Sequence, residues 1–465
     1  MIEILFVIYK VLFWLTEFNC VYYCILFLIG ILFPRQKYPM AEDKEKFCIF
    51  VPCHNEGSVI KATVLNYAAI NYDENLFDIY FIADNCADNT ADEIKRAIEE
   101  VGCANFHILE RSEKDPRKNG KPHALRWAIS MLESGDGFYD KYDMLMILDA
   151  DNFVDADILK HINSQYLSYK PKKRPTMIQT YLDCKNNRGL VAKGYFASYR
   201  ITGTFWHTAK QKLRLVPAIG GTGYAVTTEF LKSIGGFNCT SLTEDLEIQT
   251  KATIKNKIIV YNRNVRIYDE KPTKIKQSFV QRTRWAQGHW YLFFKFVPLL
   301  FLQLFNLKTI KATFRKIDMM IYLMSKLLII CATLASALVV FFFFYDRSIK
   351  LIPDYFGILG YFLLAVSLLV IPLSSLYDGT KKEKRRVLID FIPNYISMMV
   401  VSIIDTLAIF VGLFKCGNQR VWKKTAHKIT EMNTDDTEGQ NASVQPVLPS
   451  NIMSADKDTK EHRTA

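Results

Sequence analysis

Cysteine is scarce in this chain, and its spacing carries no sign of a special role. Ten cysteines are spread over 465 residues, and none of them forms a CxxC pair. That number is far too low for a disulfide scaffold, so we interpret the cysteines as reduced thiols. A Cys/His cluster with metal-ligand spacing is also lacking, which argues against zinc. No recognised nucleic-acid motif occurs, so nucleic acid is not an expected partner.

Long apolar runs flank an ordinary globular stretch, which excludes a wholly soluble chain. Residues 11–33 supply the roughly 20 apolar residues that a spanning helix needs. A cleaved signal peptide would need a basic start and small residues at the cleavage site, whereas Glu3 precedes the first lysine. We therefore predict a retained transmembrane anchor over residues 1–34. Further apolar runs lie at 319–345, 355–377 and 387–414.

The formal net charge of +12 comes largely from basic residues beside these runs. Basic loops next to membrane spans are typical of the cytoplasmic side and also face anionic lipid headgroups. We therefore predict a multi-pass protein of the cell membrane with its globular part in the cytoplasm. If 387–414 crossed the membrane fully, the five basic residues that follow it would lie on the outer side. Either this run therefore breaks at Pro393 and is partly interfacial, or another crossing exists.

Other segments outside the globular part have their own character. Residues 291–305 are short, amphipathic and interrupted by Lys295 and Pro298, so we expect interfacial helices over 291–318. A membrane-associated region then covers 319–429. Residues 430–465 are polar and lack aromatics, which predicts a disordered tail. Asp405 within the last run either faces a wet interior or pairs with a basic neighbour.

Residues 35–290 form one globular domain in which apolar strands alternate with helices. Expected strands are 47–51, 78–83, 106–109 and 144–148, and expected helices are 58–67, 90–101 and 122–132. This order predicts an α/β fold with a mostly parallel sheet. Ligands of such sheets bind outside the carboxyl ends of the strands.

Acidic residues follow two of these strands. Asp149 and Asp151 are two positions apart, so in an extended segment they point to one side and repel unless a cation lies between them. A hard divalent ion that also holds phosphates suits such a pair; a solvated turn is the alternative. Asp84 ends a neighbouring strand and could accept hydrogen bonds from a base edge or from ribose.

Three later segments carry further candidate residues. Lys121 follows a glycine at a helix start, where a cation is favourable if an anion such as a diphosphate binds. Gly221 and Thr222 lie in a glycine-rich turn that allows close approach to a ligand. Thr243 could cap a helix that begins at Glu244, while a carboxylate there, such as Asp245, could act as a general base.

The last candidate segment reads Gln281-Arg282-Thr283-Arg284-Trp285. The planar guanidinium of Arg284 can bind a diphosphate, and the Trp285 ring offers a flat face to a sugar. A basic-aromatic membrane anchor is the alternative interpretation.

Together, the order D, DxD, TED and QxxRW resembles the membrane-embedded, inverting family 2 glycosyltransferases, such as cellulose, hyaluronan and poly-N-acetylglucosamine synthases. The resemblance spans residues 47–290 and is greatest to bacterial exopolysaccharide enzymes. It implies a nucleotide-sugar glycosyltransferase A-type domain with mostly parallel sheet, flanked by transmembrane and interfacial helices. Trp422 to Thr425 (WKKT) also resembles a C-terminal motif of related enzymes.

The resemblance also implies roles for individual residues. The nucleotide-sugar site would comprise Pro52, His54, Glu56, Asp84, Lys121 and Asp149, with Asp84 holding uracil. Asp151, together with Asp149, would bind Mg²⁺ or Mn²⁺. The catalytic residues would be Glu244, Asp245 and Arg284, with Asp245 as the general base. Gly221, Thr222, Gln281, Arg284 and Trp285 would form the acceptor and diphosphate end. His54 stands where an aromatic residue is commoner, and Ala83 replaces the first residue of the usual Asp-Asp pair.

The implied activity is transfer of a sugar from a UDP-sugar to a growing β-linked polysaccharide, processive and coupled to export. The alternative is a single transfer to a lipid acceptor. Membrane lipids and an accessory export subunit are the remaining expected partners.

Overall fold

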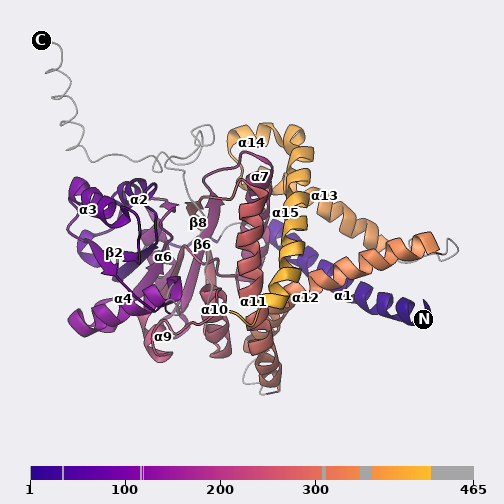
Figure 1. Ribbon diagram of the computed structural model, residues 1–465, viewed down its shortest axis with the longest axis horizontal. Coiled ribbons are helices and arrows are strands. Elements are labelled where there is room, and N and C mark those ends of the chain that lie inside the picture. Colours follow the sequence, from indigo (N-terminus) through magenta and orange to yellow (C-terminus); the bar gives the residue numbers. More distant parts are fainter. Residues whose placement is uncertain are drawn as a thin grey trace, which may run out of the picture.

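The computed structural model describes residues 2–33, 36–115, 118, 120–305, 310–345 and 358–419. Figure 1 shows a sheet covered by helices on one side of the molecule and a group of long helices on the other. Residues 422–425 and the predicted tail lie outside the described residues, so those two predictions are not addressed by the structure.

The sheet contains eight strands in the order β3-β2-β1-β4-β7-β6-β8-β5. The first four in that order run parallel, as do β6 and β8, whereas β7 and β5 are antiparallel to their neighbours. The predicted mostly parallel α/β fold is therefore confirmed. The strands are β1 (Phe47–Cys53), β2 (Phe77–Asp84), β3 (Phe106–Arg111), β4 (Met144–Ile147), β5 (Phe153–Val154), β6 (Met177–Cys184), β7 (Tyr224–Thr227) and β8 (Ile259–Asp269).

Helices cover both faces of this sheet and continue into the group of long helices. All three helices expected near 58–67, 90–101 and 122–132 are present as α2, α3 and α4. The helices are α1 (Ile2–Leu32), α2 (Ile60–Tyr67), α3 (Thr90–Val101), α4 (Lys121–Asp136), α5 (Phe138–Lys141), α6 (Ile158–Leu167), α7 (Leu190–Ile201), α8 (Thr208–Leu213), α9 (Thr228–Ser233), α10 (Glu244–Ile254), α11 (Ile275–Leu304), α12 (Ile310–Tyr345), α13 (Ile358–Asp378), α14 (Lys381–Arg385) and α15 (Val387–Lys415), with a π-helical turn η4 at Thr202–His207 between α7 and α8.

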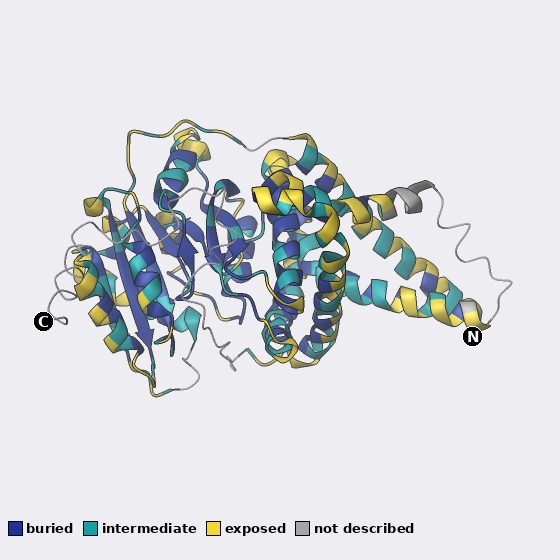
Figure 2. Cartoon of the chain, turned by 90° about the horizontal axis from the view of Figure 1, so that it is seen from above, coloured by how far each residue is buried: buried dark blue, intermediate teal, exposed yellow. Residues whose placement is uncertain are grey.

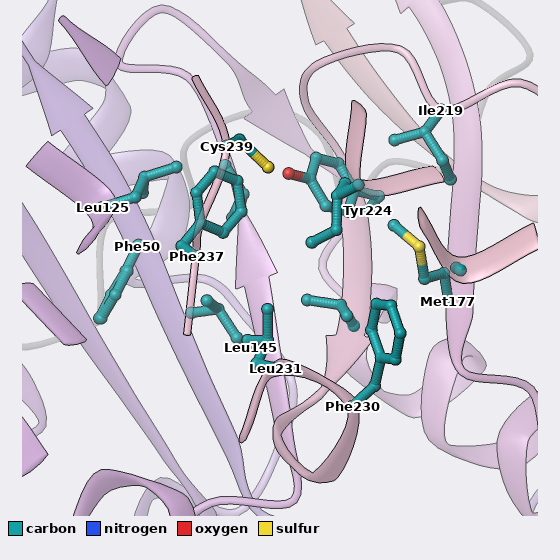
Figure 3. Packing of buried hydrophobic residues seen from close by; sticks show 14 of the residues in the cluster. Phe50, Leu125, Leu145, Met177, Ile219, Tyr224, Phe230, Leu231, Phe237 and Cys239 are labelled. Atoms are coloured by element: carbon teal, nitrogen blue, oxygen red, sulfur yellow. The ribbon is translucent and has the colours of Figure 1, made fainter. Parts of the chain in front are cut away.

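The alternation of side chains along β1 divides the core into two halves. Cys48 and Phe50 point to one face, where α4, α9 and α11 pack, and Phe47, Ile49 and Val51 point to the other. Figure 2 shows the strands as almost wholly buried. Figure 3 shows the first half, in which side chains from β1, β4 and β7 interdigitate with those of neighbouring helices and loops. This packing holds the strand ends in fixed positions.

Helix α11 joins the sheet to the long helices without interruption. It passes through residue 290, which sequence analysis gave as the domain boundary, and contains Pro298 in its interior. Leu292, Phe296 and Leu300 recur every four residues and pack into the first core half. The other side of the same turns exposes apolar residues, among them Phe301. Interfacial character for 291–305 stays a prediction, and the segment is also a core helix of the sheet domain.

Three helices, α1, α12 and α15, are long and apolar enough to cross a membrane, and α13 contains a shorter apolar stretch. Helix α15 continues through Pro393, so the break at that residue, one of the two alternatives for this run, is not observed. A proline removes one helical hydrogen bond, and packing against neighbouring helices can compensate for that loss within a membrane. Among those neighbours, α15 contacts α7, α11 and α13.

Small residues let the long helices approach the sheet domain closely. A Cβ atom at Gly194 on α7 would overlap the backbone carbonyl of Ser397 on α15, and one at Gly30 on α1 would lie 2.6 Å from the backbone of Phe205. Such backbone approach is typical of helix contacts in membranes. The two regions are therefore in direct contact along their backbones.

We expect Gly194→Ala to destabilise the protein by about 1–3 kcal/mol, because the added methyl group forces α7 and α15 apart. The matched control is Gly135→Ala on α4, where an added Cβ meets nothing within 4 Å. That change should stabilise by about 0.5–1 kcal/mol through backbone entropy. Thermal unfolding in detergent, followed by tryptophan fluorescence, measures both; an equal response of the two variants would contradict the close approach.

Candidate active site

A cavity of about 770 Å³ lies at the carboxyl ends of β1, β2 and β4, between α4, α10 and α11. It extends toward α1 and α12, where Tyr23 and Tyr322 line it. Every site residue expected from the sequence lines this one cavity, so the structure brings all of them together. They are Pro52, His54, Glu56, Asp84, Lys121, Asp149, Asp151, Gly221, Thr222, Glu244, Asp245, Gln281, Arg284 and Trp285.

Asp84 lines the cavity and is held by the residue after β2 and by the last residue of β3. Its Oδ1 accepts hydrogen bonds from Arg111 Nη1 at 2.6 Å and from Asn85 Nδ2 at 3.0 Å. His54 Nδ1 lies 2.7 Å from the Asp84 carbonyl oxygen and therefore donates to it. The unusual histidine at position 54 thus fixes the backbone of Asp84.

Lys121 begins α4 and connects three parts of the cavity wall. Gly120 precedes it with φ of 104°, a conformation that glycine adopts at little cost. Lys121 Nζ donates to Asp149 Oδ1 at 2.5 Å and to the Gly221 carbonyl at 2.7 Å, and it lies 3.7 Å from Glu244. Burial alone would lower the Lys121 pKa, but these carboxylates raise it overall. The ammonium group is therefore firmly charged.

The acidic loop after β4 presents two carboxylates with different exposure. The Asp149 side chain is 41% exposed, whereas Asp151 is buried. Asp151 Oδ2 accepts the backbone N–H of Glu270 at 3.1 Å. The Thr222 hydroxyl accepts the backbone N–H of Asp149 at 3.0 Å. Thr222, expected at the acceptor end, therefore also supports the acidic loop.

These carboxylates fit a divalent cation that is held jointly with a substrate. Among the described residues, no group of three or more His, Cys, Asp or Glu side chains is arranged to hold a metal by itself. Mg²⁺ is commonly bound by one or two carboxylates together with substrate phosphates and water. Asp149 and Asp151 supply oxygen donors of that kind.

Asp245 lies in the first turn of α10, beside Glu244. Burial and the neighbouring Glu244 carboxylate raise the pKa of Asp245 to about 7, against the opposing effects of the Leu246 N–H, Lys121 and Arg284. A carboxyl with such a pKa accepts a proton readily near neutrality. Thr243 occupies the N-cap position of a helix that begins at Glu244, as the sequence suggested, but its side chain makes no capping hydrogen bond. Helix α11 passes close to this residue. A Cβ atom added at Gly288 would lie 2.9 Å from the backbone nitrogen of Thr243 and would also collide with the Oγ1 of Thr243.

Arg284 on α11 faces these acids with a guanidinium that is only partly engaged. It donates to the Leu242 carbonyl at 3.3 Å, and among the described residues no carboxylate lies within 4 Å of it. Burial lowers the Arg284 pKa, while Glu244, Asp245 and Asp149 oppose that shift. The arrangement leaves positive charge available for an anionic ligand.

Gln281, Arg282 and Trp285 occupy the part of the cavity nearest the long helices. Gln281 accepts a hydrogen bond from Tyr195 at 3.5 Å, and Trp285 packs against an apolar cluster that α7 and α15 form together. The Arg282 guanidinium lies 5.1 Å from the Trp285 ring and 3.6 Å from Asp405. Lys326 pairs with the same carboxylate at 3.4 Å. The predicted pairing of Asp405 with a basic neighbour is therefore observed, and both basic partners also line the cavity.

Sequence analysis missed several residues of this site. Arg111 could have been found, since a cation directly after the third expected strand lies at the same edge as Asp84. Asp269 is the last residue of β8, and it forms an ion pair of 2.6 Å with Lys271 just beyond the strand. Burial raises the pKa of Asp269 to about 6, although Lys271 opposes this shift. Burial also lowers the pKa of nearby Lys185 to about 8. These residues were missed because no strand was assigned after residue 148.

Comparisons with known proteins agree with this geometry. Residues 45–288 match the family described as "Glycosyltransferase like family 2". The probable glycosyltransferase YdaM of Bacillus subtilis is 23% identical over 401 residues, which cover 83% of this chain and 87% of that protein. The poly-β-1,6-N-acetyl-D-glucosamine synthase of Staphylococcus aureus is 26% identical over 251 residues, or 53% of this chain and 55% of that relative.

Among solved structures, the mannosyltransferase PcManGT from Pyrobaculum calidifontis, in complex with GDP-Man and Mn²⁺, superposes with a TM-score of 0.54. It is 16% identical in sequence, and the match covers 87% of this chain and 99% of that one. The fold is thus shared, including part of the long-helix region. Since the family match covers just over half of its length, this chain belongs to the family 2 glycosyltransferases.

Proposed function

We propose that this protein is a membrane-bound, inverting glycosyltransferase that moves a hexose from a UDP-sugar to a growing β-linked polysaccharide. The observation that carries the proposal is the half-buried Asp245 carboxyl, with its pKa raised to about 7, in the same cavity as Arg284 and the Asp149–Asp151 pair. The name of the staphylococcal relative supports a β-linked polymer as the product class.

In the proposed reaction, Asp245 takes the proton from an acceptor hydroxyl. The acceptor oxygen forms a bond to the anomeric carbon on the side opposite the diphosphate, and the bond from that carbon to the diphosphate oxygen breaks. The leaving diphosphate keeps the electron pair, so an α-linked donor gives a β-linkage. One base suffices for this single displacement, in contrast to the two carboxylates of glycoside hydrolysis.

Negative charge that grows on the diphosphate needs compensation within the cavity. Arg284 and Lys121 supply fixed positive charge there. Lys121 is also the first residue of α4, and a helix N-terminus favours anions. Asp151 and Asp149 would hold Mg²⁺ or Mn²⁺, which when bound offsets charge on the same leaving group. Glu244 keeps the pKa of its neighbour Asp245 high.

The extension of the cavity toward α1 and α12 supports transfer beside the membrane. Its lining there includes Tyr23, Trp206 and Tyr322 together with the charged Lys326. A polar polymer needs such a lined path, because unsatisfied polar groups are costly in hydrocarbon. We place the catalytic domain in the cytoplasm on the basis of the basic loop at 381–386. The same extension would also suit the sugar-bearing end of a lipid, which is the alternative acceptor.

Asp151→Asn should abolish metal-supported nucleotide binding and most of the transfer activity, because an amide is a poor ligand for a hard cation. The amide oxygen can still accept the Glu270 N–H, so the fold should persist. Calorimetric titration of UDP with and without Mn²⁺ provides the measurement. Asp157→Asn, in the loop outside the cavity, is the control; full activity of the Asp151 variant would refute the metal assignment.

The pH dependence of transfer should reflect Asp245. We expect kcat/KM to rise with pH and level off above about 7, because the base must be deprotonated. Glu244→Gln removes the negative charge beside Asp245, so kcat/KM should begin to rise at lower pH. Asp245→Asn should reduce transfer by roughly 10²- to 10⁴-fold with UDP binding nearly unchanged.

Glu229→Gln changes a first-turn acid of α9 outside the cavity and serves as the control. An Asp245→Asn protein that transfers normally but no longer binds UDP would instead make Asp245 a donor-site residue.

Product analysis tests the proposed function itself. Purified full-length protein in vesicles, given external UDP-sugars with Mg²⁺ or Mn²⁺, should make a polymer that becomes protected inside the lumen. A single sugar attached to a lipid would support the alternative acceptor, and transfer from none of the UDP-sugars would overturn the proposal.

A further inference from the structure

Asp84 is held in a way that leaves only one of its two oxygens for a ligand. Oδ1 accepts from both Arg111 Nη1 and Asn85 Nδ2. A carboxylate oxygen has about two lone-pair sites, so Oδ1 is saturated. Oδ2 accepts no hydrogen bond from any residue in the described part of the chain. Since Asp84 lines the cavity, the ligand meets a single acceptor atom.

The two donors are themselves fixed in place. The Arg111 side chain is 5% exposed, and its Nη2 donates to the Lys118 carbonyl at 2.8 Å. Asn85 Oδ1 accepts the backbone N–H of Glu113 at 2.7 Å. Because an oxygen must face that N–H, the amide nitrogen of Asn85 must face Asp84. The backbone N–H of Asn85 also donates to the Arg111 carbonyl at 2.9 Å, which ties the two strand ends together.

We propose that Arg111 and Asn85 are positioning residues that set the nucleotide base specificity by reducing Asp84 to one acceptor. A single acceptor matches uracil, whose N3–H is one donor between two carbonyl groups. Guanine presents two adjacent donors, N1–H and the 2-amino group, which call for two free carboxylate oxygens. Cytosine presents an acceptor at N3 and is repelled. This inference rests on the proposed UDP-sugar donor and on the role that the family resemblance implies for Asp84, which is to hold the base.

Side chains select the base here, because the fold alone does not determine which base is bound. A buried polar site discriminates strongly when the wrong ligand leaves a group unpaired. The Asp84 side chain is only 7% exposed, so water cannot readily replace a missing partner. Single-acceptor geometry is therefore sufficient to favour uracil.

Asp84→Asn tests the arrangement with a side chain of the same shape. Both neighbours donate, so the new amide oxygen must face Arg111 and Asn85, and the amide NH₂ must face the base. We expect UDP to bind roughly 10- to 100-fold more weakly, because the amide NH₂ and the uracil N3–H are both donors and would face each other. CDP should bind more tightly than to the wild type, since cytosine N3 can accept from the amide.

Calorimetric titration of UDP, CDP and GDP into the full-length protein in detergent, with Mg²⁺ present, measures the preference without any acceptor. Asp88→Asn, four residues along, is the control, because its carboxylate bonds to Thr90 and Gly57 outside the cavity. That variant should keep the wild-type order of affinities. Arg111→Lys, which keeps the charge but loses the fork of donors, should lower the ratio of UDP to GDP affinity.

The outcomes separate this inference from the proposed function. Inverted preference in Asp84→Asn, with UDP favoured in the wild type, supports the inference. A variant that still prefers UDP, or that loses UDP without gaining CDP, overturns the inference alone. Wild-type protein that binds none of the three nucleotides overturns the inference together with the proposed function.

Discussion

Buried carboxylates must be matched by cations or hydrogen-bond donors, and Lys121 provides much of that matching at the edge of this sheet. Its ammonium group joins the end of β4, through Asp149, to the glycine-rich turn at Gly221 and to Glu244 on α10. These three segments come from distant parts of the sequence. The acidic loop, the turn and the helix that carries Asp245 can therefore approach one another only while this cation is present. The same charge is available to a diphosphate, so the group that stabilises the empty cavity is also suited to the ligand.

Helix α11 connects the cavity to the group of long helices as a rigid element. Its first turns carry Gln281 and Arg284, and its later turns pack into the sheet core through Leu292. Gly412 of α15 lies so close to α11 that a Cβ there would be 2.7 Å from Ala286 Cβ. The part of the cavity that Gln281 and Arg284 line therefore cannot shift relative to α15 without disturbing packed backbone. This rigidity keeps the reacting groups at a constant position beside the long helices.

The first half of the domain could be predicted from sequence, because short-range signals there agree with one another. Apolar runs of strand length alternate with helices up to residue 148, and the rule that ligands bind at strand ends then gathers Asp84, Lys121 and Asp149 in one place. Beyond that point β7 and β5 run antiparallel to their neighbours, and β8 carries alternating polar residues such as Asn262. Asp269 was missed for this reason. Continuity of α11 and α15 could not be predicted either, because it depends on tertiary packing rather than on local propensity.

Asp405 shows why the cavity can extend between the long apolar helices. A carboxylate on an apolar helix is costly unless it is paired or hydrated. Arg282 from α11 and Lys326 from α12 both approach this one group, so three helices converge on it. Two cations against one anion leave an excess positive charge, and Arg282 and Lys326 both line the cavity. An excess charge of this kind needs water or an anionic or hydroxyl-rich ligand as a neighbour. The ion cluster therefore joins the helices and at the same time requires a polar interior beside Trp285.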